Sequence, residues 1–140
     1  MKHQDILRVV AKLLGPPILL FALYVQFHGD YGPGGGFQAG VIFAVGFVLH
    51  ALVHGLDETL QVLPPWVLRL CIAGGVIIYI GVGFVCLALG GTFLDYSVLA
   101  EQPIAGQHLG ILLVELGVGI TVFSVMVTVF CAFAARSGGE

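Results

Sequence analysis

Long apolar stretches follow one another along the chain, and charged residues fall almost only between them. No Asp, Glu, Lys or Arg occurs within residues 13–29, 31–56, 70–94 and 116–135. A helix needs about 20 apolar residues to cross the hydrocarbon core of a bilayer, so each stretch is close to the length of one crossing. The pattern therefore predicts four membrane-spanning helices, over about residues 6–28, 37–56, 67–90 and 108–135.

The predicted fold is an all-α integral membrane protein in which residues 1–140 form a single membrane domain. Composition agrees, because 59% of the residues are hydrophobic and 9% are charged, against about 25% charged in soluble domains. Pro16 and Pro17 fall inside the first predicted helix, and because proline lacks a backbone N–H we expect a kink or a restart there. The same break indicates that the basic N-terminus opens a retained helix rather than a cleaved signal peptide.

The basic residues predict how the helices are oriented in the membrane. With four crossings, one side of the membrane receives all five Lys and Arg residues of the chain: Lys2, Arg8, Lys12, Arg69 and Arg136. The loops on the other side, residues 28–36 and 91–107, carry acids but no Lys or Arg. Because basic residues accumulate on the cytoplasmic side, both termini are expected to be cytoplasmic.

The fourth predicted helix has two different faces. Small and weakly polar residues recur along one of them, at spacings that allow close helix packing in lipid: Gly110, Gly117, Thr121, Ser124 and Thr128. Glu115 lies about 200° from Gly117 at 100° per residue, so it points to the other face. We expect both faces to need protein neighbours, and four short helices to be too few to cover them without partner subunits.

Glu115 is the strongest candidate for ion chemistry, because it is the only Asp or Glu between residues 102 and 135. An ionised acid in hydrocarbon costs several kcal/mol unless it is paired or faces water. Two roles are open: a proton or cation relay, and a structural carboxylate hydrogen-bonded to a neighbouring subunit. His108 lies on the same face as Glu115, and Asp30 is placed to present a polar group at the mouth of an outer pathway.

His50 and His54 lie four residues apart and share one face of the second helix. Imidazole titrates near neutral pH, so the pair is a candidate for a hydrated proton path, with packing or interhelical hydrogen bonding as the alternative. Two imidazoles without a third ligand do not predict a metal site. Neither a cysteine metal-binding pattern nor a nucleophile–base pair is evident, so no enzyme or cofactor is expected. The net charge of -3 does not predict nucleic-acid binding.

The connection between the first two helices is rich in turn residues. It reads HGDYGPGGGFQAG over residues 28–40, where glycine permits positive φ and close backbone approach. No Lys-Ser or Lys-Thr step follows, which argues against a phosphate-binding loop. Gly36 and Gly40 form a GxxxG step into the second helix, a pattern typical of close helix packing.

This turn resembles the signature of the B subunit family of the multisubunit Na+/H+ antiporters, known as Mrp, Mnh or Pha systems. The family motif reads GHxxPGGGFxGG, and the residues that match it form the predicted structural turn motif: Pro33, Gly34, Gly35, Gly36, Phe37 and Gly40. Asp30 and Ala39 depart from the motif, which has histidine and glycine there. Chain length, helix number and the Glu-Leu-Gly step at residues 115–117 extend the resemblance across the chain.

The resemblance implies a subunit of a secondary antiporter that exchanges cytoplasmic Na+ for external protons in the bacterial plasma membrane. It implies a role in the assembly and activity of the complex. The implied partners are large A and D type subunits that are similar to proton channels, small C, E, F and G type subunits, and membrane lipid. The alternative, from a different class, is a self-sufficient small transporter that dimerises and exchanges protons. Exchangers of that kind carry their essential glutamate in the first helix, where this chain has none between Lys12 and Asp30.

Overall fold

The computed structural model describes residues 2–137, with side chains from residue 4 onward, as helices joined by short turns. Four helices are long and apolar enough to cross a membrane, which confirms the prediction of an all-α chain with four spanning helices. They are α1 Lys2–His28, α2 Gly36–His54, α4 Pro65–Ala88 and α5 Pro103–Ser137. Two short helices occupy the connections, α3 Leu56–Val62 and the 3-10 helix η1 Tyr96–Leu99.

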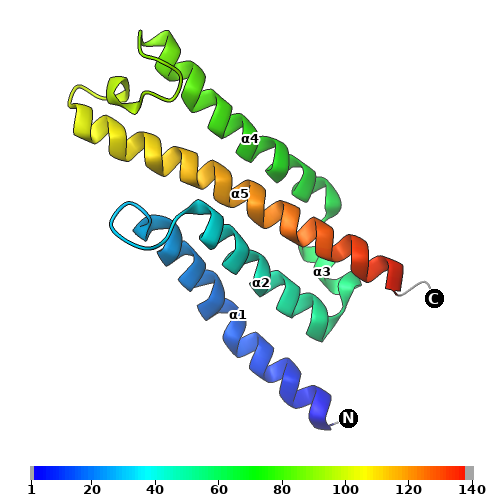
Figure 1. The fold of residues 1–140 in the computed structure, drawn as a ribbon. Helices are drawn as coiled ribbons and strands as arrows, with labels where there is room; N and C mark the ends of the chain where they lie inside the picture. The colour runs from blue at the N-terminus through cyan, green and yellow to red at the C-terminus, as the bar shows by residue number, and fades with distance from the viewer. Residues whose placement is uncertain (1, 138–140) are drawn as a thin grey trace.

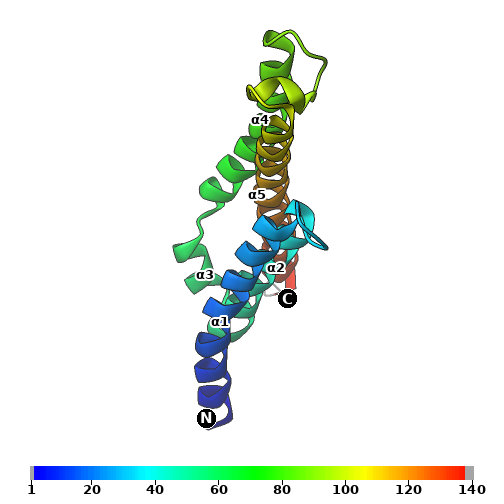
Figure 2. The same cartoon turned by 90° about the vertical axis from the view of Figure 1, so that its left-hand side faces the viewer.

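The long helices lie side by side in a row rather than in a closed bundle (Figure 1). α5 packs against α4 on one side and α2 on the other, while α1 packs mainly against α2. Turned by 90°, the helices overlap in a narrow band (Figure 2). Both chain ends lie at the same end of the row, as an even number of crossings requires (Figure 1). Which side of the membrane holds them stays a prediction.

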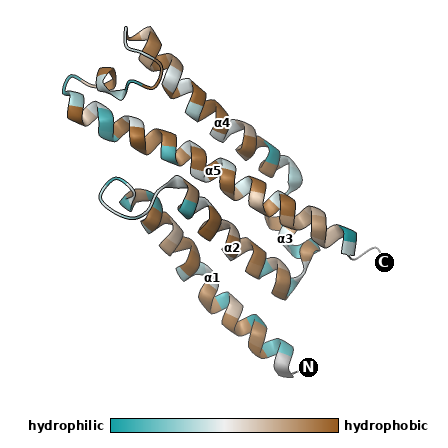
Figure 3. Cartoon of the chain, viewed as in Figure 1, coloured by the Kyte–Doolittle hydropathy of each residue, from teal (hydrophilic) through white to brown (hydrophobic). Residues whose placement is uncertain are grey.

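A single row of helices leaves broad apolar faces uncovered. Hydrophobic residues dominate the long helices (Figure 3), and many of their side chains are exposed. Side chains such as Leu20, Ile77 and Phe133 are 67%, 67% and 68% exposed, respectively. Continuous apolar surface of this extent marks contact with lipid or with other proteins. The chain therefore presents both broad faces of the row to the membrane or to partner subunits.

Glycines bring α5 close to the helices on both of its sides. On the α4 side, a methyl group added to Gly117 would lie 2.8 Å from the carbonyl oxygen of Gly75. On the α2 side, a methyl group added to Gly40 would lie 2.6 Å from the carbonyl oxygen of Gly119. The chain thus supplies neighbours of its own on both faces of α5, with α4 against the small-residue face and α2 against the face of Glu115.

Two helix features differ from the sequence predictions. α1 continues through Pro16 and Pro17, so of the two predicted outcomes, a kink or a restart, the restart does not occur. Each proline φ is compatible with a helix, although the backbone N–H is missing and the ring crowds the carbonyl one turn earlier. α5 begins at Pro103, ahead of the predicted start at residue 108, with proline at the first position, where its missing N–H has no helical partner to lose. With 35 residues α5 is about 52 Å long, so it tilts or projects beyond the roughly 30 Å hydrocarbon layer.

Candidate functional site

A cleft of about 400 Å³ lies where the turn between α1 and α2 meets the first half of α5. We call it the glycine-turn cleft, and it is lined by Gln26, Phe27, Asp30, Tyr31, His108, Leu109, Leu112 and Glu115. Three of the five residues proposed for an ion pathway are among them: Asp30, His108 and Glu115. The other two, His50 and His54, lie at the opposite end of α2.

The glycine turn folds back onto the end of α1 through backbone hydrogen bonds. The amides of Tyr31 and Gly32 donate to the carbonyl oxygen of His28 at 3.0 and 3.1 Å, and the Gly35 amide donates to that of Val25 at 3.2 Å. Gly35 has φ 129°, a conformation that side chains other than glycine rarely adopt. The turn motif is therefore required for the backbone path that closes one wall of the cleft.

Glu115 reaches the turn because glycines leave room for it. Methyl groups added to Gly29 and Gly35 would lie 2.9 and 3.1 Å from its Oε1 atom, and one added to Gly36 would overlap the Glu115 backbone. The side chain is half-buried. Within residues 2–137 it takes part in no ion pair, since the one ion pair found there joins two other residues. The carboxylate thus faces the cleft without a charged partner from the described part of the chain.

That ion pair forms the rim of the cleft. Nδ1 of His108 contacts Oδ2 of Asp30, linking α5 to the turn across 78 residues of sequence. The ring of Tyr31 stacks on His108, with centroids 6.4 Å apart. The His108 side chain remains 52% exposed, so the pair is accessible from solution. Protons and cations can therefore reach this rim before they reach Glu115.

Gln26 is a polar residue of the cleft that sequence reasoning missed. It is 5% exposed, and its Nε2 atom has no hydrogen-bond partner in the described part of the chain. A methyl group added to Gly119 would lie 2.6 Å from Oε1 of Gln26, and Gly119 is one helical turn from Glu115 in α5. In the sequence, Gln26 is an uncharged amide inside the apolar run of α1. A search limited to ionisable residues therefore does not find it.

The polar groups are arranged in order along one face of α5. His108, Leu112, Glu115 and Gly119 are spaced by four, three and four residues, so they share that face. Moving inward from the rim, the ion pair comes first, the Glu115 carboxylate second and the Gln26 amide third. Beyond them the rings of Phe43, Phe47 and Phe123 pack with centroids 5.0 to 5.9 Å apart. The cleft therefore carries a line of polar groups between partly apolar walls, and the aromatic cluster lies farther along α5, outside the cleft lining.

The helix-packing candidates lie on other parts of α5. Gly110 contacts the ring of Tyr96 in η1, and Thr121 lies against a glycine of α4. Burial, followed by the influence of Tyr79 and Cys86, raises the pKa of the Tyr96 phenol, which keeps this contact uncharged. The hydroxyls of Ser124 and Thr128 donate to carbonyl oxygens one turn earlier in α5, at 2.7 and 2.6 Å. Ser124 is fully buried, whereas Thr128 is exposed, so of these two hydroxyls only that of Ser124 lies inside the packed row.

Histidine and acidic side chains do not gather into a metal site in this structure. Within residues 2–137 there is no group of three or more His, Cys, Asp or Glu residues placed to hold a metal ion. What the cleft does offer is a chain of groups that exchange protons or bind hydrated cations: an accessible imidazole–carboxylate pair and an unpaired carboxylate behind it.

Comparison with known proteins gives a consistent result over the whole chain. The profile of the family described as "Domain related to MnhB subunit of Na+/H+ antiporter" matches residues 6–128. A protein of Staphylococcus haemolyticus (strain JCSC1435) named "Putative antiporter subunit mnhB2" is 38% identical over 144 residues, covering 100% of this chain and 99% of that protein. A protein of Staphylococcus aureus (strain Newman) with the same name has the same identity and coverage.

Proposed function

Because the chain belongs to the family of MnhB-related subunits of Na+/H+ antiporters, we propose that it is a subunit of a multisubunit antiporter and that its glycine-turn cleft forms part of the ion pathway. The family points to a transporter subunit rather than an enzyme. The transported ions are Na+ and H+, and the complex works in the bacterial plasma membrane with both ends of this chain in the cytoplasm. The cleft then opens toward the outer side.

The observation that carries the proposal is the unpaired Glu115 carboxylate at the back of an accessible cleft. A carboxylate at this depth is costly unless water, a proton or a cation reaches it. The His108–Asp30 pair at the rim supplies an exposed imidazole that can carry a proton, and the cleft of about 400 Å³ has room for water between rim and carboxylate. A proton taken up at His108 can pass through that water to Glu115.

The shape of the subunit supports a role in assembly. The row of helices exposes two broad apolar faces, and Phe37 of the turn motif is 61% exposed. Large A and D type subunits and small C, E, F and G type subunits are the proposed neighbours on these faces. A pathway that begins in the glycine-turn cleft continues through such a neighbour, since the residues that line the cleft all lie at the end of the row that holds the glycine turn.

The test is a Glu115→Gln variant in the complete antiporter. Glutamine keeps the size and a hydrogen-bonding oxygen but cannot exchange a proton. We expect Na+-dependent proton exchange in everted membrane vesicles to fall at least tenfold, while the yield of assembled complex on native gels stays unchanged. Glu101→Gln is the matched control, since Glu101 is exposed in the loop before α5 and lies outside the cleft. A fully active, normally assembled Glu115→Gln complex would remove the cleft from the ion pathway.

A further inference from the structure

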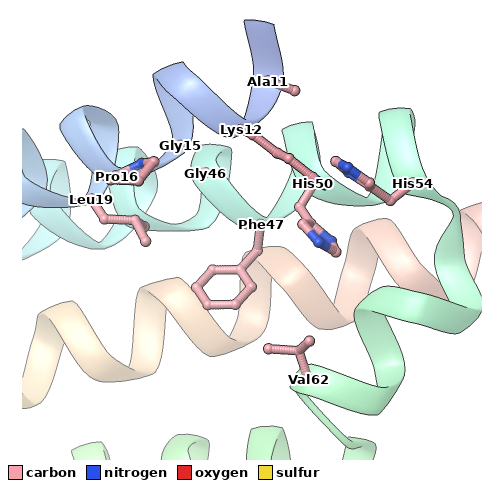
Figure 4. A pocket seen from close by; sticks show the side chains of 10 residues that line it. All are labelled: Ala11, Lys12, Gly15, Pro16, Leu19, Gly46, Phe47, His50, His54 and Val62. Atoms are coloured by element: carbon pink, nitrogen blue, oxygen red, sulfur yellow. The ribbon is translucent and has the colours of Figure 1, made fainter. Parts of the chain in front are cut away.

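A second hollow, of about 270 Å³, lies between α1 and α2 at the end of the row that holds the chain termini. We call it the α1–α2 groove. Figure 4 shows the Lys12 side chain extending from α1 toward α2, where the rings of His50 and His54 lie side by side. The rest of the lining is apolar and includes Leu19 and Phe47. The groove therefore has a polar, basic end and a hydrocarbon-like remainder.

His54 lacks hydrogen-bond partners inside this groove. Both of its ring nitrogens are buried, and neither has a partner in the described residues 2–137. Neutral imidazole carries one N–H donor, and a buried donor without an acceptor costs about 1–3 kcal/mol. A molecule that accepts a hydrogen bond from His54 would remove that cost.

His50 has a defined hydrogen-bonding state that leaves one nitrogen free. The Thr59 hydroxyl donates to the carbonyl oxygen of Gly55 at 3.0 Å, so at 2.8 Å it accepts from Nδ1–H of His50. The His50 and His54 rings stack with centroids 4.5 Å apart. The free Nε2 of neutral His50 is therefore an acceptor, so the donors that the groove offers to an anion are the Lys12 ammonium and the N–H of His54.

The charges around the groove favour an acceptor-rich, negatively charged ligand. Lys12 can only donate hydrogen bonds, and within residues 2–137 it has no ion-pair partner. Arg8 lies one helical turn from Lys12 on α1 and does not line the groove. The acids Asp57 and Glu58 at the start of α3 are exposed and do not line the groove. A phosphate group fits this donor set.

The apolar part of the groove distinguishes a lipid from a free ion. A volume of 270 Å³ is below the roughly 300–1,000 Å³ of sites that enclose a whole small ligand. It holds a phosphate and the first part of an acyl chain, with the remainder left in the bilayer. Basic pockets between membrane helices on the cytoplasmic side are suited to anionic lipid headgroups. We propose that the α1–α2 groove binds an anionic phospholipid, with its phosphate between Lys12 and His54.

Wild-type protein provides the first test, which needs no variant to fold. The complex is reconstituted in nanodiscs with photoactivatable phosphatidylglycerol or photoactivatable phosphatidylcholine, each with the reactive group early in an acyl chain. We expect cross-links to residues 46–54 of α2 to be at least fivefold more frequent with the anionic lipid. Equal cross-linking by the two lipids would overturn the proposal.

Variants then locate the phosphate. Native mass spectrometry of the detergent-extracted protein should show a bound anionic phospholipid that is lost from Lys12→Gln and from His54→Phe but retained by Arg8→Gln. Phenylalanine keeps the ring that stacks on His50 and removes the unpaired nitrogens, so the fold is preserved. Retention of the lipid by both groove variants would refute the site. So would displacement of the lipid by millimolar inorganic phosphate, or a partner-subunit segment filling the groove in a structure of the complex.

Discussion

Gly36→Ala tests most directly whether the contact between α2 and α5 holds the site together. A Cβ atom at this position would overlap the backbone carbonyl group of Glu115. Backbone cannot rotate away as a side chain can, so α2 and α5 must separate near the cleft. Overpacking of this kind costs about 1–3 kcal/mol. At 1.4 kcal/mol per factor of ten, the packed arrangement becomes about 5-fold to 150-fold less favoured.

The glycines of this chain form a graded series that checks the magnitude. At Gly40 the added methyl group would lie 2.6 Å from a carbonyl oxygen, a smaller clash, whereas at Gly81 nothing lies within 4 Å. Gly81→Ala is the matched control, because it changes the same residue type inside a helix and gains up to about 1 kcal/mol of helix propensity. The expected order of destabilisation is Gly36→Ala, then Gly40→Ala, with Gly81→Ala neutral or stabilising.

The assay measures assembly and transport on the same preparations. Thermal loss of the complex, followed by size-exclusion chromatography after heating, reports the packing of α2 on α5. Na+-dependent proton exchange in vesicles reports the position of Glu115. We expect Gly36→Ala to lower both, because the clash falls on the backbone of the residue that carries the carboxylate. If Gly36→Ala matches Gly81→Ala in heat resistance and activity, the close approach of the helices plays no part in the site.

Three further predictions follow from the cleft and the turn. Gly35→Val should reduce the yield of assembled complex on native gels several-fold, since a β-branched residue resists φ 129°, and a normal yield would contradict the proposed turn geometry. His108→Asn should lower antiport several-fold while the yield of assembled complex stays unchanged, because asparagine cannot take up and release a proton; unchanged antiport would argue against a proton-transfer role. Tyr31→Cys should react with a membrane-impermeant maleimide in intact cells, because Tyr31 is 78% exposed in the turn that we place outside, and labelling only after cell lysis would reverse the orientation.

Local pattern was sufficient for most of the fold. The charge-free runs located the spanning helices to within a few residues, because the thickness of hydrocarbon sets both their length and their composition. The 100° step of a helix placed Glu115 and Gly117 on different faces of α5, and the structure packs α2 and α4 against those faces. The glycine-rich turn could be predicted because closely spaced glycine and proline residues are typical of turns.

The site depended on information that local pattern does not contain. Asp30 and His108 are 78 residues apart, and only the position of α5 between α4 and α2 brings them together. Gln26 lines the cleft because the end of α1 lies beside Gly119 of α5. The sequence of α1 alone does not show that contact. Likewise, periodicity showed that two faces of α5 need cover, but only the fold shows that α2 and α4 lie against them. The sequence alone determined the helices and the direction of each face, since these follow from neighbouring residues. Tertiary structure alone decided which faces meet, because that depends on the order in which four similar apolar helices pack.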